Sequence, residues 1–496
     1  MQPDRTPATI PADARRRFLD ALRRVLPEGT LLTEAEELHP YECDGLSAYR
    51  QVPMAVALPD TLAQLQQVVR ICHHHDIPVV ARGAGTGLSG GAYPLEDGII
   101  LSLARFNRIL DIDPANRLAT VEPGVRNLAI SEAAEPHGLY YAPDPSSQIA
   151  CSIGGNVAEN SGGVHCLKYG LTVNNVRQVK IVTADGELVT LGSETFDGPG
   201  YDLLALINGS EGMLGIIVEI TVLLRPRATR TTVLLAPFDD IARAGDAVAA
   251  IIAAGVVPAG LEMMDKLTLE AAEAFVHAGY PTDAEALLIC ELDGSDIDVD
   301  AETAAVTKIL RDAGASDIRV ADDAAERARF WAGRKAAFPA VGRIAPDYYC
   351  MDGTIPRRHL GQVLERIGEL SGQYGLTVGN VFHAGDGNLH PLILFDANQP
   401  GELEKAERLG GDILEACIEV GGTITGEHGV GIEKLDQMCS QFDSAELTQF
   451  HAVKAAFDPK GILNPGKGVP TLHRCAEFGM MHVHHGELPF PELPRF

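Results

Sequence analysis

VVARGAGTGLSGG, residues 79–91, is a short apolar run that leads into a loop containing five glycines. Its Gly85-x-Gly87-x-x-Gly90 spacing formally matches the dinucleotide fingerprint, but that fingerprint must open a helix. Here Pro94 and a turn at residues 96–98 follow, and the next apolar run, residues 99–103, is typical of a strand. The stretch therefore predicts a strand and a loop whose backbone N–H groups bind an anion at close range, rather than a Rossmann helix.

Two further segments rich in small residues lie in the same half of the chain. Residues 143–163 contain PDPSS, GGN and NSGG, and residues 209–217 read GSEGMLGII. A single segment of this kind is most simply explained as a turn. Three of them, all between apolar runs of one region, favour a loop system that wraps around a cofactor.

The composition is that of an acidic globular protein. A chain of 496 residues is long enough for at least two domains. Asp plus Glu outnumber Lys plus Arg by 68 to 40, a formal charge of −28, and this field repels the phosphates of nucleic acids. Residues 1–11 lack the apolar core of a signal peptide, and the apolar segment 247–261 is interrupted and too short to span a bilayer. We therefore expect a cytoplasmic protein with no nucleic-acid partner and no membrane span of its own.

The hydrophobic patterns divide the chain into two main regions. From about residue 52 to 225, strand and helix patterns alternate, with a helix beginning after Thr61 and a hairpin at Asp185-Gly186. From residue 230 to about 440, helices and strands mix as in an α+β domain with an antiparallel sheet. We predict an N-terminal segment (1–50) packed on a cofactor domain (51–229), a substrate domain (230–440) and a C-terminal segment (441–496) that returns to the cofactor domain.

Two histidines flank a hairpin signal in the sequence HAGDGNLH, residues 383–390. If Asp386-Gly387 is a two-residue turn, His383 faces His390 across two antiparallel strands, with Cβ atoms roughly 4.5–5.5 Å apart. Two imidazoles at that spacing can share a divalent metal, and the sequence GEHG, residues 426–429, can add a carboxylate from Glu427 while His428 remains free as a base. A surface hairpin with two coincidental histidines is the alternative.

These segments resemble a known family. The loops RGAGTGLSGG, PDPSSQIACSIGGNVAENSGGVHCLKYG and GSEGMLGII are similar to the flavin-binding domain of the vanillyl-alcohol-oxidase-like (PCMH-type) FAD oxidoreductases. HAGDGNLH, GEHG and the late NPGK run (464–467) resemble the 2-hydroxy-acid dehydrogenase branch. YECDGLSAYR (41–50), DYYCMDGTIPRR (347–358) and the tail 471–496 are similar to the FAD-linked large subunits of bacterial glycolate oxidases.

The resemblance implies which residues contact FAD. The first loop would hold the pyrophosphate, the second would line the flavin and ribityl chain, and the third would line the adenine end. Because the first loop contains no His or Cys, we expect FAD to be bound noncovalently. The implied contacts are Arg82, Gly83, Ala84, Gly85, Thr86, Gly87, Leu88 and Gly91; Pro143, Ser147, Gly154, Gly155, Asn160, Gly163 and Tyr169; Gly215 and Ile217; and Asn464.

The resemblance also implies which residues bind the substrate, which one acts as a base and which hold a metal. Arg334 matches the family's substrate arginine, and its planar fork suits a carboxylate; the alternative is a helix-surface arginine paired with Glu326. His428 would act as general base and Asn388 as a substrate hydrogen-bond donor. A divalent metal on His383, His390 and Glu427, zinc or another first-row ion, would bind the substrate hydroxyl and lower its pKa.

The expected reaction is oxidation of glycolate to glyoxylate, with D-lactate as a secondary substrate. A D-lactate or D-2-hydroxyglutarate dehydrogenase is the alternative within the family, and a noncatalytic flavin-binding scaffold is the alternative of another class. The nine cysteines lack an iron–sulfur spacing, so electrons must leave through another protein. The resemblance implies a second flavin-type subunit and an iron–sulfur subunit that pass electrons to membrane quinone at the inner face of the cell membrane, with the tail 471–496 docking on a partner.

Overall fold

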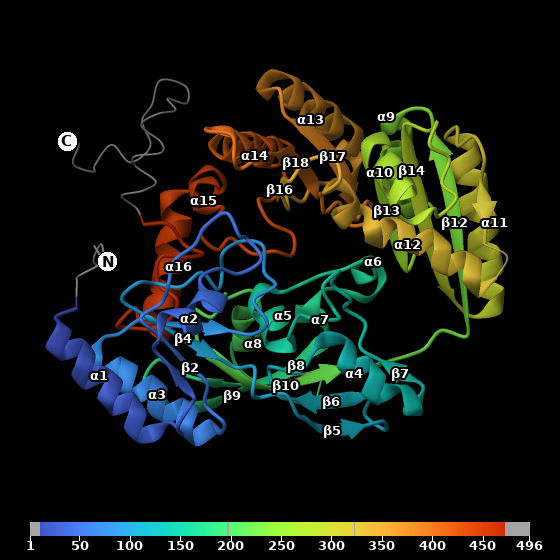
Figure 1. The fold of residues 1–496 in the computed structure, drawn as a ribbon. Helices are drawn as coiled ribbons and strands as arrows, with labels where there is room; N and C mark the ends of the chain where they lie inside the picture. Colours follow the sequence, from blue (N-terminus) through green and yellow to red (C-terminus); the bar gives the residue numbers. More distant parts are fainter. Residues whose placement is uncertain (1–9, 196–197, 322, 472–496) are drawn as a thin grey trace.

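The computed structural model describes residues 10–195, 198–321 and 323–471. Figure 1 shows two domains that meet along a broad interface, with the first domain, residues 10–226 and 444–471, below the second, residues 227–443. Among the described residues, no helix is long and apolar enough to cross a membrane.

The first domain contains a four-stranded sheet, a five-stranded sheet, a two-stranded sheet formed by β7 and β11, and the helices around them. The four-stranded sheet has the order β1-β2-β4-β3, in which β2, β4 and β3 are parallel, and the five-stranded sheet is antiparallel with the order β5-β6-β10-β8-β9. Its strands are β1 (Leu31–Leu32), β2 (Ala55–Ala57), β3 (Val79–Arg82), β4 (Ile99–Ser102), β5 (Ile109–Asp113), β6 (Leu118–Val121), β7 (Leu139–Tyr140), β8 (Val176–Val182), β9 (Leu188–Gly192), β10 (Ile216–Leu223) and β11 (Arg225–Pro226). Its α-helices are α1 (Ala12–Val25), α2 (Ala35–Leu38), α3 (Leu62–His75), α4 (Asn127–Ala134), α5 (Ile153–Glu159), α6 (Cys166–Tyr169), α7 (Thr172–Asn175), α8 (Leu203–Ile207) and α16 (Ser444–Phe457).

The local chemistry of the first domain explains these boundaries. The Thr61 side chain accepts the Gln64 N–H and starts α3, whose apolar face is buried against α1 through Phe18 and Leu22. As expected, no helix follows β3, and residues 83–98 form a loop. The chain returns after α16, where the Val79 N–H donates to the Ile462 carbonyl at 2.8 Å and places the 464–467 run beside β3.

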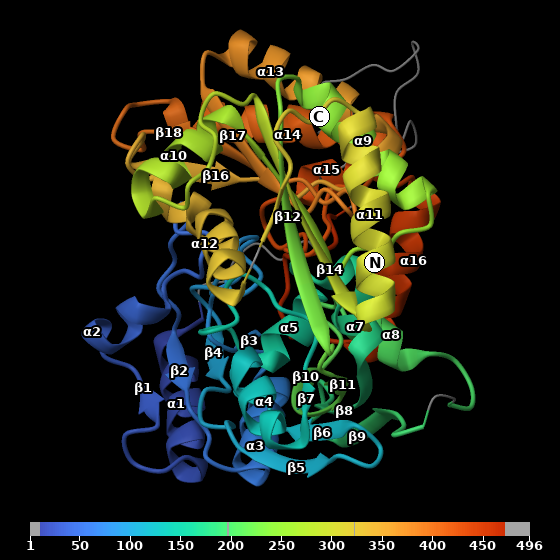
Figure 2. The same cartoon turned by 90° about the vertical axis from the view of Figure 1, so that its right-hand side faces the viewer.

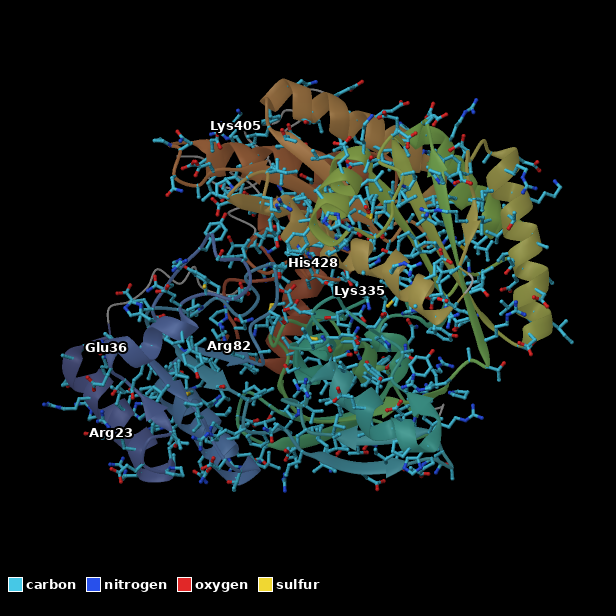
Figure 3. All side chains as sticks on the ribbon, turned by 45° about the vertical axis from the view of Figure 1, so that its right-hand side comes forward. Arg23, Glu36, Arg82, Lys335, Lys405 and His428 are labelled. Carbon is cyan, nitrogen blue, oxygen red and sulfur yellow. The ribbon has the colours of Figure 1, made fainter. Side chains whose placement is uncertain are left out.

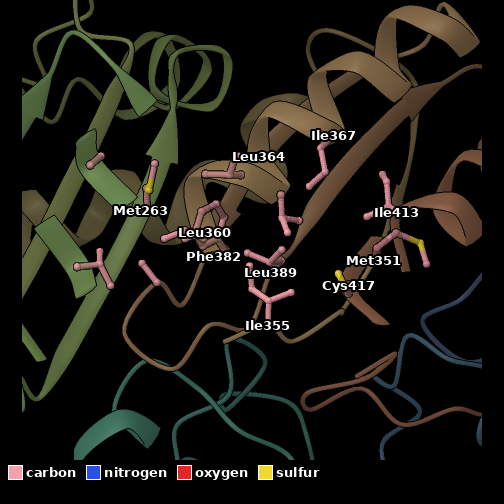
Figure 4. Packing of buried hydrophobic residues seen from close by; sticks show 14 of the residues in the cluster. Met263, Met351, Ile355, Leu360, Leu364, Ile367, Phe382, Leu389, Ile413 and Cys417 are labelled. Atoms are coloured by element: carbon pink, nitrogen blue, oxygen red, sulfur yellow. The ribbon is translucent and has the colours of Figure 1, made fainter. Parts of the chain in front are cut away.

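The second domain is built on a seven-stranded sheet with the order β15-β12-β14-β13-β17-β18-β16. Residues at alternate positions face opposite sides, so β12 buries Leu234 on the face covered by α9 and α11 and Val233 on the face covered by α12. Figure 2 shows the long β12 and β14 strands, and Figure 4 shows α13 packing on Phe382 and Leu389. The strands are β12 (Arg230–Phe238), β13 (Gly260–Asp265), β14 (Ala286–Gly294), β15 (Arg319–Val320), β16 (Asp347–Cys350), β17 (Thr377–Phe382) and β18 (Pro391–Phe395); the helices are α9 (Ile241–Ala253), α10 (Lys266–Val276), α11 (Asp296–Asp312), α12 (Ala324–Val341), α13 (Leu360–Tyr374), α14 (Glu402–Glu419) and α15 (Leu435–Gln441).

The predicted two-residue turn at Asp386-Gly387 is wrong. Asn380 pairs with Pro391 and His383 with Asn388, so four residues, Ala384 to Gly387, connect the two strands. The register therefore differs from the expected one by two residues. Because side chains alternate with a period of two, this shift leaves His383 and His390 on the same face of the hairpin.

His165 connects the two domains through a pair of carboxylates. It precedes α6, and its Nδ1 lies 2.8 Å from Oδ2 of Asp144 in the first domain, whereas its Nε2 lies 3.0 Å from Oε1 of Glu291 on β14. Burial lowers the pKa of His165, but the charges and hydrogen bonds of Asp144 and Glu291 outweigh burial and raise the pKa well above 6.5. His165 is therefore a cation that joins the domains.

We expect His165→Asn to lower the free energy of unfolding by about 2 kcal/mol at about pH 5.5, the scale of hydrogen bonds to charged groups. Because the folded-state pKa of His165 is raised above 6.5, this stabilisation is complete below the unfolded-state pKa and disappears as the pH rises through the folded-state value. Denaturant unfolding at several pH values measures it. His39→Asn, which removes a mostly exposed partner of Glu42, is the control, and a His165 effect that grew with pH would contradict this account.

Candidate active site

A cavity at the domain junction is lined by residues of all three predicted loops. Its wall includes the first loop from Arg82 to Leu88, part of 143–163, and Gly215 and Ile217. Glu427 and His428 from the second domain also line it. In Figure 3 His428 lies at the junction of the domains, above Arg82. The cavity therefore joins the predicted cofactor loops to the predicted catalytic loop.

The cavity wall fits a large polar cofactor. A Cβ atom added to Gly83 would lie 2.1 Å from Oγ of Ser152, and one added to Gly85 would lie within 2.3 Å of the Arg82 guanidinium. Gly85 also has a φ of 71°, which favours glycine. The buried hydroxyl of Ser152 lines the cavity and has no hydrogen-bond partner among the described residues. The loop thus leaves backbone and hydroxyl groups available to a ligand.

The predicted cofactor residues fall into two groups. The lining contains Arg82, Gly83, Ala84, Gly85, Thr86, Gly87, Leu88, Gly91, Ser147, Gly154, Gly155, Gly215 and Ile217. Outside it lie Pro143, Asn160, Gly163, Tyr169 and Asn464. Tyr169 donates its hydroxyl to Asp293 of the second domain at 2.6 Å, and the Asn464 amide donates to the carbonyls of Gly91 and Glu211. Tyr169 therefore joins the domains, and Asn464 ties the first loop to the third.

His383, His390 and Glu427 converge as the sequence suggested. Their ligating atoms lie within 4.8 Å of one another, and Oε1 of Glu427 is 3.0 Å from Nε2 of His390 and 3.4 Å from Nε2 of His383. The planes of the two imidazole rings are inclined by 86°. Because each nitrogen lone pair lies in the plane of its ring, lone pairs in such intersecting planes can point towards a common position. Two imidazoles and one carboxylate with an open fourth position form a donor set that zinc and other first-row ions accept.

Cys350, His390 and His428 form a second group whose ligating atoms are close together. The rings of His390 and His428 are stacked, with centroids 5.1 Å apart and planes inclined by 8°. Lone pairs in two nearly parallel, stacked planes do not converge on one point. This geometry favours the group that contains Glu427 as the metal site and leaves His428 free.

His428 has the properties of a neutral base. Its Nδ1 is buried without a hydrogen-bond partner among the described residues, and its Nε2 is 4.0 Å from Oε1 of Glu427. Burial lowers the pKa of His428 to about 4, although the charge of Asp352 acts in the opposite direction. An imidazole in this state can accept a proton.

Arg334 is held by a buried carboxylate. It lies on α12, and its Nε and Nη2 are 2.8 and 2.7 Å from Oε2 of Glu262. The alternative of a helix-surface arginine paired with Glu326 is wrong, because the Arg334 side chain is only 6% exposed and contacts β13 instead. Oε1 of the same Glu262 is 2.8 Å from Nδ1 of His383, so one carboxylate orients both the arginine and a candidate metal ligand.

Asn388 lies beside the catalytic loop. The carboxamide is buried, and a Cβ added to Gly426 would lie 2.6 Å from its Cγ. Its Oδ1 has no hydrogen-bond partner among the described residues. The unpartnered atom is an acceptor, whereas the resemblance implies a hydrogen-bond donor, so the donor role of Asn388 stays a prediction.

Sequence reasoning missed three buried carboxylates around this site. Glu262 supports Arg334 and His383, Asp352 accepts backbone N–H groups of residues 426–428, and Glu211 accepts those of Val430 and Gly431. Glu262 sits in an apolar strand, where a single acid is the only signal. Asp352 lies in DYYCMDGTIPRR and Glu211 in GSEGMLGII, where the neighbouring motif residues and glycines are the stronger sequence signals.

The fold and the cavity define an FAD-linked oxidoreductase. Residues 53–192 match a family described as FAD binding domain, and residues 227–468 match FAD linked oxidases, C-terminal domain. The structure of p-cresol methylhydroxylase with substrate bound has the same fold, with a TM-score of 0.80 at 19% identity over 94% of this chain and 98% of that one. These findings confirm the predicted PCMH-type α+β fold and the FAD cofactor.

Relatives of known name show to which family of FAD-linked oxidoreductases the chain belongs. The chain is 65% identical over 99% of both lengths to glycolate oxidase subunit GlcD of Escherichia coli strain K12. It is 32% identical to the D-lactate dehydrogenase of Anaerostipes hadrus, over 91% of this chain and 96% of that one. The chain therefore belongs to the GlcD family of FAD-linked oxidases.

Proposed function

We propose that this protein oxidises glycolate to glyoxylate with FAD as the hydride acceptor. The observation that carries the proposal is that one cavity runs from the FAD loops to Glu427 and His428. The 65% identity to the GlcD subunit supports glycolate as the substrate. When bound, the flavin supplies an acceptor for the hydride of the substrate carbon.

His428, which lines the cavity, and Arg334 and Asn388, which lie outside its lining, have separate roles in this proposal. Arg334, oriented by Glu262, binds the substrate carboxylate through the edge of its guanidinium that Glu262 leaves uncovered. Asn388 binds a polar group of the same substrate. His428 accepts the proton of the hydroxyl at Nδ1 or Nε2, and burial at the domain junction excludes water from the reacting atoms.

We propose that His383, His390 and Glu427 hold a divalent metal, zinc or another first-row ion. Glu262 accepts from Nδ1 of His383 and so directs Nε2 towards Glu427. The N–H of Gly162 in the first domain donates to Oε2 of Glu427 at 3.0 Å, which leaves Oε1 for the histidines and the metal. The chemistry that a metal held by these residues would supply is a lower pKa of the substrate hydroxyl.

D-lactate is the proposed secondary substrate, and D-2-hydroxyglutarate is the weakest candidate. A dicarboxylate needs a second cation, but Lys335 is exposed and Arg343 is exposed and donates to the Ala274 carbonyl. Comparison of kcat/KM for the three acids with a dye acceptor tests this proposal. Glycolate is expected to rank first, and a preference for D-2-hydroxyglutarate would overturn it.

We expect FAD to be held noncovalently. Cys166 lies outside the cavity lining, and Cys151 lines the cavity but burial raises the pKa of its thiol. Asp144 and Glu291 engage both ring nitrogens of His165. The purified protein should be yellow, and acid precipitation should release intact FAD into the supernatant, as chromatography of the extract would show. Colour that stays with the precipitate would demonstrate a covalent bond.

We propose that electrons pass to partner subunits, a second flavin-type chain and an iron–sulfur chain, and then to quinone. The Escherichia coli relative and a Bacillus subtilis relative at 39% identity are both named as glycolate oxidase subunits, which supports a multisubunit enzyme. The protein would then be cytoplasmic and reach the inner face of the membrane through those partners.

The tail 471–496, apart from Thr471, lies outside the described residues, and its docking role rests on its sequence. Deletion of 471–496 is expected to leave FAD binding and dye-linked activity intact while removing co-purifying subunits and quinone reduction. Loss of FAD on truncation would place the tail in the fold instead.

A further inference from the structure

The catalytic loop, residues 425–431, is held from the second domain by Asp352. The Oδ2 atom of Asp352 accepts the N–H groups of Gly426 at 3.0 Å and His428 at 2.9 Å, and Oδ1 accepts that of Glu427 at 3.2 Å. The Thr425 hydroxyl donates to the same carboxylate at 2.6 Å. The buried Lys434 ammonium, 3.2 Å from Oδ2, balances the charge. Asp352 thus fixes the backbone that carries Glu427 and His428.

The other end of the catalytic loop is held from the first domain by Glu211. Oε1 of Glu211 accepts the Val430 N–H and Oε2 accepts the Gly431 N–H, both at 2.7 Å. The loop fits closely there, because a Cβ added to Gly431 would lie 2.0 Å from the Ser89 carbonyl oxygen. Glu211 also lines the cofactor cavity and precedes β10. Its position is therefore tied to the FAD loops and not to the second domain.

We propose that Asp352 and Glu211 are paired positioning residues. Together they fix the position of the catalytic loop relative to both domains. Asp352 sets the geometry of the metal ligand and base within the second domain. Glu211 sets the distance from those groups to the flavin pocket. Charge-assisted hydrogen bonds to successive backbone N–H groups are short and directional, which suits this task. The inference rests on the proposed function for the identity of the metal and substrate.

Substitutions of the two residues should affect different properties of the enzyme. In Glu211→Gln the side chain keeps one acceptor oxygen, so one of the two N–H groups loses its partner. Because a displacement of about 1 Å can cost about 100-fold in rate, flavin reduction by glycolate should slow 10- to 100-fold (an order-of-magnitude range) with FAD and zinc affinity retained. In Asp352→Asn zinc affinity should fall by about 10–100-fold, the usual loss when a ligand's support is removed.

The experiment uses the FAD-loaded full chain. Zinc affinity is measured by competition with a chromophoric chelator, flavin reduction by anaerobic stopped-flow, and loop protection by hydrogen exchange of a peptide spanning 425–431. Glu211→Gln should speed exchange at Val430 and Gly431. Glu219→Gln on β10, which breaks a partly exposed pair with Lys180 on β8, and Asp347→Asn, which alters the acceptor of the Ala397 N–H, are matched controls and should resemble the wild type.

Three outcomes would overturn the inference: wild-type flavin reduction and exchange in Glu211→Gln, wild-type zinc affinity in Asp352→Asn, or equal loss of zinc in both variants. If Glu211→Gln does not fold, Glu211→Asp, which keeps the charge but shortens the reach, should show the faster exchange with FAD bound. Hydrogen exchange needs neither metal nor substrate. Failure of the proposed function would instead appear as wild-type protein whose flavin glycolate does not bleach, with the exchange difference unchanged.

Discussion

Replacing His383 or His390 with alanine is expected to abolish both turnover and metal binding while the flavin spectrum stays unchanged. The two imidazoles supply most of the proposed donor set with Glu427. Lewis-acid activation of the hydroxyl is worth several kcal/mol, and each ~1.4 kcal/mol is tenfold in rate. The loss should therefore be on the order of 1,000-fold or more. Metal content by elemental analysis and dye-linked glycolate oxidation measure the two effects together.

The flavin provides the internal control for these variants. Neither histidine lines the FAD cavity, so bound FAD should report a folded protein. His359→Ala removes a histidine on the second domain that contacts Gln362 instead of the site, and this variant should retain full activity and metal. Full activity in His383→Ala after thorough chelation would show that the pair is structural.

Substituting His428 with asparagine is expected to slow flavin reduction by glycolate by roughly 100- to 10,000-fold, the usual contribution of a general base. The side chain of His428 is close to Glu427, but its Nδ1 has no partner within the described part of the chain, so metal and FAD should stay bound. Rapid anaerobic mixing with glycolate measures the bleaching rate directly. This variant also separates an enzyme from a noncatalytic flavin scaffold, which has no need of a free imidazole here.

Retention of rapid, substrate-driven bleaching in His428→Asn would assign the base to another residue. His277→Asn, at the left-handed C-cap of α10, is a matched control that should bleach at the wild-type rate. Loss of FAD in His428→Asn would instead mean that the ring packs against the cofactor and supports its binding.

Parts of the fold follow directly from local sequence signals. The capping box formed by Thr61 and Gln64 starts α3. The hairpin predicted at Asp185-Gly186 joins β8 and β9, and Gly186 has a φ of 85°. The strands β12 and β13 carried no clear prediction. Both faces of their sheet are buried, so their side chains lack the polar alternation that identifies a strand.

Local sequence patterns predicted the histidine pair of the candidate site but not the long-range contacts that support it. The hairpin prediction had the wrong turn, yet it paired the correct faces because the register error was two residues. Glu262 lies 121 positions from His383 and 72 from Arg334. Contacts over such separations depend on how the sheet is assembled, and no local pattern near Glu262 signals them. The same holds for Glu211, which reaches Val430 across the domain junction.

Anaerobic addition of glycolate to the FAD-loaded protein, with and without its divalent metal, tests the central claim most directly. The metal-loaded protein should lose its flavin absorbance rapidly and yield glyoxylate, because the hydroxyl proton and the hydride both leave from one site. The chelated protein should bleach on the order of 1,000-fold more slowly, and added zinc or manganese should restore the rate. Equal bleaching rates with and without metal would contradict the account, and so would a flavin that glycolate does not reduce at all.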